Sequence, residues 1–398
     1  EACAYALIAV GLNIQFGYGG LFNFGIMGFL MIGGFAAAFM SFEVNAEFWD
    51  SDGPMLLGRA LIAFVIGAVL VVLARQSHRV GITGRGKTAL VAVAWLAAYL
   101  IYRSQIDPAA AYIESTSGWV GGLGAHPVLG WALGGLLAGI VADIVGKIAL
   151  GLRTDYLAIA TIGISEIIRA LIKNMDWLTR GSMTVSPVPW PTPLPQDLQA
   201  TGVSINDSFV FARLWFLLLA VAILALVVFL VQRAYRGPWG RMMRAIRDNF
   251  IAAGSMGKNV KTRQVEIFVF GAVLMGIGGA MLVSFNQILD PGGYQPINQT
   301  FLIWVIVIVG GAGNNWGVLL GTVLIYTVFV VSDPVAQFFL LNLSDMTEAA
   351  GWGAIPEIDT RSLQMRVFVL GLVISLALRY APRGLLPEVL HRPAEAKK

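Results

Sequence analysis

The sequence predicts an all-α bundle of membrane-spanning helices. Hydrophobic residues make up 57% of the chain, charged residues only 13%, and the mean hydropathy is +0.74. Soluble domains carry about 25% charged residues, so a water-soluble core of this size is excluded. Hydrocarbon offers backbone amides no partners, and the apolar stretches reach about twenty residues, twice the length of a barrel strand. We therefore expect one polytopic transmembrane domain over residues 1–398, with about 8–11 membrane segments, some of them short or broken.

Eleven apolar stretches are the candidate segments, and several are shorter than the ~20 residues of a full crossing. The glycine-rich stretch 310–317 predicts a tight turn between two of them, and alternate prolines over 187–195 predict an extended loop, because proline lacks a backbone donor. Glycines inside the segments fit either close helix packing or helices broken beside a substrate path. The stretches cover residues 2–17, 19–40, 55–74, 88–103, 128–150, 156–173, 212–232, 265–287, 300–312, 315–332 and 363–380.

Basic loops predict the orientation of the chain in the membrane. Residues 75–87, 233–263 and 379–398 together carry 17 of the 27 Lys and Arg residues. The positive-inside rule places these three stretches, including the C-terminus, on the cytoplasmic side. An even number of segments separates each stretch from the next, which agrees with a shared side. The remaining loops are acidic and are expected to face outward.

Metal, disulfide and nucleic-acid chemistry are not expected. Cys3 is the only cysteine, and the three histidines, His78, His126 and His391, are far apart in sequence. No basic helix interleaved with aromatic residues is present, so nucleic acid is not an expected partner. Residues 84–88 are similar to the end of a phosphate-binding loop, but they lack its first glycine and lead into an apolar segment. The chain itself is therefore expected to hold no ATPase site.

The loop 233–263 holds eight Lys and Arg residues and, inside it, an Ala-rich helix-forming run. A plain cytoplasmic loop would explain its charge but not the helix. The alternative is a short surface helix, over about 248–261, that docks into a soluble partner. Apolar contact would then come from Ile251, Ala252 and Met256, while Ala253 and Gly257, four apart on one face, would permit close approach.

Several patches, in the right order, carry a family resemblance. The chain resembles the LivM-like permease subunits of ABC importers for branched-chain amino acids, the hydrophobic amino acid uptake family. The patches are GLNIQFGYGGL over 11–21, LRTDYLAI over 152–159, EIIR over 166–169, the stretch 174–179, GPWGR over 237–241 continuing to Gly257, VGGAG over 309–313 with 316–317, and PRGL over 382–385.

The resemblance implies a permease that moves branched-chain or other apolar amino acids by alternating access. Implied partners are a second homologous permease, two cytoplasmic ATPases that hold ATP and Mg2+, an external solute-binding protein and membrane lipid. No cofactor is implied in this chain. The implied location is the bacterial inner membrane, with multiple passes, and loop 233–263 becomes the ATPase coupling loop, with Arg247 among its contacts.

Two positions depart from the family pattern. Ile251 stands where many importer permeases have a glutamate before Ala252 and Ala253, although Gly257 keeps its place. A coupling mechanism that needs that carboxylate is therefore not expected here, whereas docking of the loop on an ATPase still is. Arg180 follows Thr179 where the family tends to have glycine, which places an arginine at the expected outer mouth of the path.

Glu166 and Arg169 are candidates for the wall of the translocation path. Residues three apart share a helix face and can pair, and a charge in hydrocarbon is costly, so the pair is expected to face protein or water. An internal ion pair that only orients the helix is the alternative interpretation. Asn174 is expected beside the pair, and Asn13 and Thr179 complete the candidate path.

Two other functions remain open. The backbone patches do not fix the solute, so urea, short amides or another small solute is an alternative. A secondary transporter coupled to H+ or Na+ would need membrane carboxylates, for which Glu166 and Asp143 are the candidates.

Overall fold

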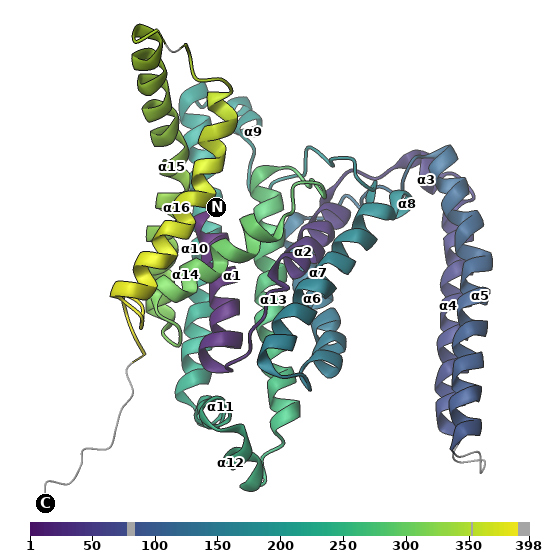
Figure 1. The fold of residues 1–398 in the computed structure, drawn as a ribbon. Coiled ribbons are helices and arrows are strands. Elements are labelled where there is room, and N and C mark those ends of the chain that lie inside the picture. The colour runs from purple at the N-terminus through teal and green to yellow at the C-terminus, as the bar shows by residue number, and fades with distance from the viewer. Residues whose placement is uncertain (78–83, 352, 389–398) are drawn as a thin grey trace, which may run out of the picture.

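The structure, a computed structural model, describes residues 1–77, 84–351 and 353–388 (Figure 1). The described chain is helical and pairs its extended segments only in isolated bridges, such as Val185 with Leu289, so the expected fold class is confirmed. The helices are α1 (Ala2–Leu12), η1 (Asn13–Tyr18), α2 (Ile26–Ser41), α3 (Ala46–Trp49), α4 (Gly53–Arg75), α5 (Arg85–Thr116), α6 (Pro127–Ala149), α7 (Thr154–Asn174), α8 (Asp176–Thr179), α9 (Pro195–Ala200), α10 (Ile205–Arg236), α11 (Pro238–Asp248), α12 (Phe250–Ser255), α13 (Val260–Asn286), η3 (Ile297–Phe301), α14 (Leu302–Gly310), α15 (Asn315–Ala349) and α16 (Ile358–Tyr380).

All eleven expected segments fall on helices, with corrected boundaries. Within the described residues, seven helices, α4, α5, α6, α10, α13, α15 and α16, are long and apolar enough to cross a membrane. The expected segment 19–40 is not continuous, because the chain is non-helical from 19 to 25 before α2 begins. Helices α5 and α15 run well beyond the expected 88–103 and 315–332, since each continues through an internal proline, Pro108 in α5 and Pro334 in α15. Of the prolines expected in an extended loop over 187–195, the first four lie in a non-helical stretch, as predicted, but Pro195 begins α9 because proline is tolerated in the first turn of a helix.

Helix α13 forms the centre of the bundle and packs against α1, α2 and α6 (Figure 1). Where α13 crosses α2 and α6, the three helices contact one another through glycine residues. A Cβ atom on Gly33 would overlap the Gly276 carbonyl group, one on Gly276 would lie 2.5 Å from the Gly134 carbonyl oxygen, and one on Gly134 would lie 2.9 Å from the Gly33 Cα. Close helix packing is therefore the correct interpretation for these three glycines.

The hairpin of α4 and α5 stands apart from the rest of the bundle (Figure 1). The two helices pack against each other through small residues such as Gly67 and Ala98, and α5 also contacts α8 at one end. Their outer faces are apolar and exposed, with Leu61, Phe64 and Trp95 all more than half exposed. Such faces suit contact with hydrocarbon rather than water.

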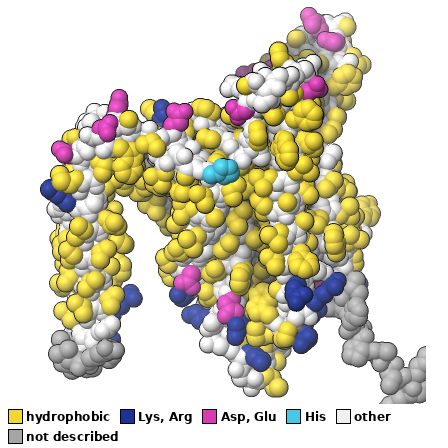
Figure 2. Space-filling view, turned by 180° about the vertical axis from the view of Figure 1, so that it is seen from behind, with side chains coloured by type: hydrophobic (Ala, Val, Ile, Leu, Met, Phe, Trp, Pro, Cys, Tyr) yellow, Lys and Arg dark blue, Asp and Glu magenta, His cyan; other side chains and the backbone are white. Residues whose placement is uncertain are grey.

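Charge is separated along the molecule. In Figure 2 most acidic side chains lie at one end and most basic ones at the other. Helices α11 and α12, the C-terminal end of α16 and the ends of α4 and α5 that flank residues 76–84 share the second end (Figure 1). Parts of the basic stretches 75–87 and 379–398, with His78 and His391, lie outside the described residues. The described parts of the basic stretches lie toward this end of the molecule, and the side of the membrane that it faces stays a prediction.

Candidate functional site

Helix α7 carries a charged pair on the surface of an apolar bundle. The Arg169 guanidinium contacts the Glu166 carboxylate at 3.3 Å, as their spacing predicts, and their side chains are 25% and 42% exposed. The Arg169 Nε is buried without a hydrogen-bond partner. Helix α7 is also missing from the seven apolar spans of the described chain. A face of this kind is costly against hydrocarbon and requires protein or water opposite it.

The rest of the exposed face of α7 is mixed in chemistry. Ile159 and Ile167 are exposed on it, and a Cβ atom on Gly163 would meet no other atom within 4 Å. Asn174 is exposed at the end of the helix, and its Nδ2 donates to the Ala170 carbonyl oxygen at 2.6 Å. Charged, amide and branched apolar groups thus share one open surface. This combination can contact each part of an apolar amino acid.

Thr179 and Asn13 do not join this face. The Thr179 hydroxyl is buried and donates to the Ile172 carbonyl oxygen at 2.5 Å, so it closes the corner between α7 and α8. Asn13 is fully buried in η1, accepts from the Gly313 amide at 2.8 Å and donates to Asn315 Oδ1 at 2.9 Å. Arg180 follows the α7–α8 corner in a left-handed conformation and donates to the Thr184 carbonyl oxygen at 3.4 Å. The structure therefore brings Glu166, Arg169 and Asn174 onto one helix but leaves Asn13 and Thr179 in structural contacts.

A polar network holds the break at 19–25, and the sequence interpretation missed it. Gln15 Nε2 donates to the Phe268 carbonyl oxygen at 2.7 Å, and Asn23 Nδ2 donates to Gln15 Oε1 at 2.8 Å. The Trp304 indole donates to the Asn23 carbonyl oxygen at 3.0 Å. Freed backbone groups at membrane depth are tolerated only where protein or water satisfies them. The signal in the sequence was the presence of Gln15 and Asn23, both fully buried, inside an apolar stretch.

The basic loop forms two helices, not the single helix expected over 248–261. Helix α11 ends at Asp248, and Asn249 caps α12 by accepting from the Ala252 amide at 2.9 Å. We call the exposed side chains of Ile251, Ala252 and Met256 the α12 surface. Ile251 is 67% exposed and Met256 is 80% exposed.

Two residues of the expected docking face are placed differently. Ala253 is buried against the bundle, because the break at Asn249 turns this side of α12 inward. Gly257 lies beyond the end of α12 with φ +77° and no atom within 4 Å of a Cβ. The expectation that Ala253 and Gly257 share one close-packing face is therefore wrong. The glycine instead provides a left-handed turn, which L-residues rarely adopt.

Arg247 also turns inward rather than outward. Its Nη1 donates to the Gly17 carbonyl oxygen at 2.5 Å and to the Glu388 carboxylate at 2.8 Å. Burial is the largest single influence on the pKa of Arg247 and lowers it, but Glu388, Tyr235 and Asp248 together outweigh burial, so the pKa is raised. Arg247 therefore joins α11 to η1 and to the end of the described chain, and it is not part of the α12 surface.

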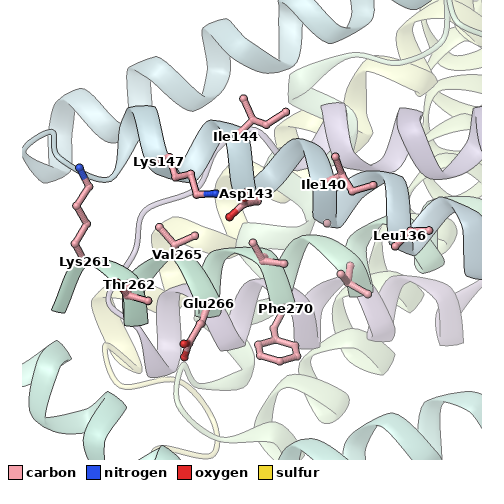
Figure 3. A pocket seen from close by; sticks show the side chains of 13 residues that line it. Leu136, Ile140, Asp143, Ile144, Lys147, Lys261, Thr262, Val265, Glu266 and Phe270 are labelled. Atoms are coloured by element: carbon pink, nitrogen blue, oxygen red, sulfur yellow. Dashed lines mark hydrogen bonds and ion pairs between the residues drawn. The ribbon is translucent and has the colours of Figure 1, made fainter. Parts of the chain in front are cut away.

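An open groove lies between α6 and α13 near the basic end (Figure 3). Leu136, Ile140 and Phe270 form much of its apolar lining, and Lys147 pairs with Asp143 at 2.5 Å. Asp143 is thus engaged with a lysine one helical turn away. Among the described residues no group of three or more His, Cys, Asp or Glu side chains could hold a metal ion.

These features define a polytopic helical membrane protein. A family model described as branched-chain amino acid transport system / permease component matches residues 1–112 and 84–378, and the chain belongs to that family. The expected family is thereby confirmed.

Individual relatives agree with the family. The chain is 29% identical over 221 residues to the high-affinity branched-chain amino acid transport system permease proteins LivM of Escherichia coli K12 and Salmonella typhimurium LT2, which covers 52% of this chain and 50% of each relative. It spans about half the length of these two relatives. A probable branched-chain amino acid transport permease protein LivM of Methanocaldococcus jannaschii is 24% identical over 391 residues, 96% of this chain and 90% of the relative. No solved structure matches the chain.

Proposed function

We propose that this chain is the transmembrane permease subunit of an ATP-driven ABC importer and forms part of the path for branched-chain or other apolar amino acids. The observation that carries the proposal is the partly exposed Glu166–Arg169 pair on α7, because such a face in a membrane needs a polar path or a partner opposite it. A second homologous permease would cover this face and complete the path. The apolar outer faces of α4 and α10 would contact lipid.

The pair suits a zwitterionic solute. Arg169 offers donors to a carboxylate, Glu166 accepts from an ammonium group, and Ile159 and Ile167 give a branched side chain apolar contact. The two charged groups already pair with each other, so the solute must compete with an existing ion pair and binds weakly. Weak, transient contact is what a path requires. High affinity would belong to an external solute-binding protein, and ATP with Mg2+ to two cytoplasmic ATPases.

The alternatives are less well supported by the geometry. An ion-coupled secondary transporter needs free carboxylates, but Glu166 pairs with Arg169 and Asp143 with Lys147. A permease for urea or short amides would not need opposite charges on one face. Both alternatives give distinct results in reconstitution, because a secondary transporter would take up solute in proteoliposomes without ATPase subunits.

The proposed function predicts that ATPase subunits co-purify with the tagged chain from its native host and support ATP-dependent uptake of radiolabelled leucine. Met256→Asp places a charge on the α12 surface, where the side chain is 80% exposed, so folding should be retained. A charge inside an apolar contact should lower ATPase recovery at least about tenfold. Met346→Asp is the matched control, because Met346 is 69% exposed at the opposite end. Leucine uptake by the chain alone, without ATPase, would contradict the proposal.

The basic end is expected to face the cytoplasm. On a Cys3→Ser background, a cysteine at Glu348 should react with an impermeant maleimide added to intact cells, and one at Ser255 should react only after the cells are opened. Both positions are exposed, at opposite ends of the molecule. The reverse labelling pattern would invert the orientation proposed here.

A further inference from the structure

The end of the described chain is fastened to the turn between α14 and α15. The Leu385 amide donates to the Val309 carbonyl oxygen at 2.8 Å, and the Leu386 amide to the Gly310 carbonyl oxygen at 3.0 Å. Asn314 Nδ2 donates to the Leu386 carbonyl oxygen at 3.2 Å. These bonds hold residues 385–388 in one position beside the basic end of the bundle, and they place the Glu388 carboxylate next to α11.

Glu388 meets Arg247 in a partly buried ion pair. The Arg247 Nη1 lies 2.8 Å from Glu388 Oε2, and the two side chains are only 20% and 16% exposed. The second carboxylate oxygen of Glu388, Oε1, is buried without a hydrogen-bond partner. The negative charge of Glu388 is therefore balanced by Arg247. Other arginine–glutamate pairs, such as Arg263 with Glu266, lie within one helix and are more exposed. The Glu388 pair instead joins residues 141 positions apart.

The same guanidinium reaches the first broken helix. It donates to the carbonyl oxygen of Gly17, two residues before the non-helical stretch 19–25. Next to this contact, Tyr18 stacks on Tyr235, and the Arg244 guanidinium lies 5.0 Å from the Tyr235 ring centre. Helix α11 is therefore joined both to η1 and to residues 385–388. Helix α12 follows α11 directly, so a displacement of α12 is carried to Arg247.

We propose that Glu388 is a positioning residue for coupling: through Arg247 it holds α11 and α12 against η1, so that movement of α12 reaches the break at 19–25. This inference rests on the proposed function, in which ATPases act on the α12 surface. Without the Glu388 carboxylate, the Arg247 guanidinium keeps only the Gly17 carbonyl oxygen and the exposed carboxylate of its sequence neighbour Asp248, 3.2 Å from Nε, as partners, and it draws toward Asp248 and water. Helices α11 and α12 then move without moving η1, and ATP hydrolysis is uncoupled from uptake.

The first measurement needs only the permease. A spin label at Ser255, at the end of α12, reports the mobility of the coupling helices in lipid nanodiscs. Glu388→Ala should raise that mobility, and Glu388→Asp, which keeps the charge, should largely restore it. Glu266→Gln breaks an arginine–glutamate pair of the same 2.8 Å length inside α13 and serves as the control. Unchanged mobility in Glu388→Ala overturns the inference.

The second measurement uses the complete complex in proteoliposomes. The ratio of solute taken up to ATP hydrolysed should fall at least about threefold in Glu388→Ala, because the variant loses a hydrogen bond between charged groups that holds α11 against η1. ATPase recovery should stay at the wild-type level, and Glu388→Asp and Glu266→Gln should keep the wild-type ratio. Raised mobility with an unchanged ratio also overturns the inference. Absence of ATPase from the wild-type preparation would instead refute the proposed function, and with it this role for Glu388.

Discussion

Gly33→Leu is expected to abolish accumulation of folded permease. Gly33 sits where α2 crosses α6 and α13, and even a Cβ atom there would overlap the Gly276 carbonyl group. The obstacle is backbone rather than a movable side chain, and the helices cannot separate without opening the packing around α13. Overpacking a core typically costs about 1–3 kcal/mol, and a clash with backbone should exceed that range.

Gly58→Leu is the matched control for this substitution. Gly58 lies inside α4, and a Cβ there would meet no atom within 4 Å. Both variants replace a helical glycine by the same residue, so insertion and helix propensity are nearly equal between them. Size-exclusion profiles and melting temperatures of the two variants in detergent provide the measurement. If Gly33→Leu is monodisperse and has the same melting temperature as Gly58→Leu, the helix crossing at Gly33 is not tightly packed.

The membrane segments could be predicted because hydropathy and length act locally. Every expected stretch lies on a helix, and the errors concern breaks and ends. The break at 19–25 was missed because Leu21, Phe22 and Phe24 keep the stretch apolar. What interrupts the helix is a set of contacts to distant segments, such as the donation from Trp304 to the Asn23 carbonyl oxygen. Local hydropathy contains no information about such contacts.

In the candidate site, too, local contacts could be predicted from the sequence and contacts between distant segments could not. Glu166 and Arg169 are three residues apart, so helix geometry alone predicts their contact. The pairing of Arg247 with Glu388 could not be predicted, because it depends on how residues 385–388 lie on the α14–α15 turn. Ala253 was misplaced for a local reason, since Asn249 starts a new helix and rotates the following residues. A capping asparagine inside a helix-forming run was the available signal.

Removing one member of the Glu166–Arg169 pair is expected to cost more than removing both. In Glu166→Gln, the Arg169 guanidinium keeps its charge while its Nε already lacks a partner. Breaking a buried pair costs about 3–5 kcal/mol and an exposed pair about 0–1, so this partly exposed pair should cost roughly 1–3 kcal/mol of stability. The double variant Glu166→Gln/Arg169→Leu leaves no unpaired charge and should recover most of that stability.

Measurements of solute uptake distinguish two roles of the Glu166–Arg169 pair: an ion pair that only orients α7, and a part of the wall of the translocation path. If the two charges meet the ammonium and carboxylate of the solute, the double variant should fold and still transport poorly, whereas a pair that only orients α7 should regain transport together with stability. Asp143→Asn, at the more exposed Asp143–Lys147 pair on α6, is the control and should change neither stability nor uptake appreciably. Normal expression and normal uptake in Glu166→Gln alone would falsify both roles. The decisive quantity is therefore uptake per folded permease in the double variant, because only there are the unpaired charge and the lost solute contact separated.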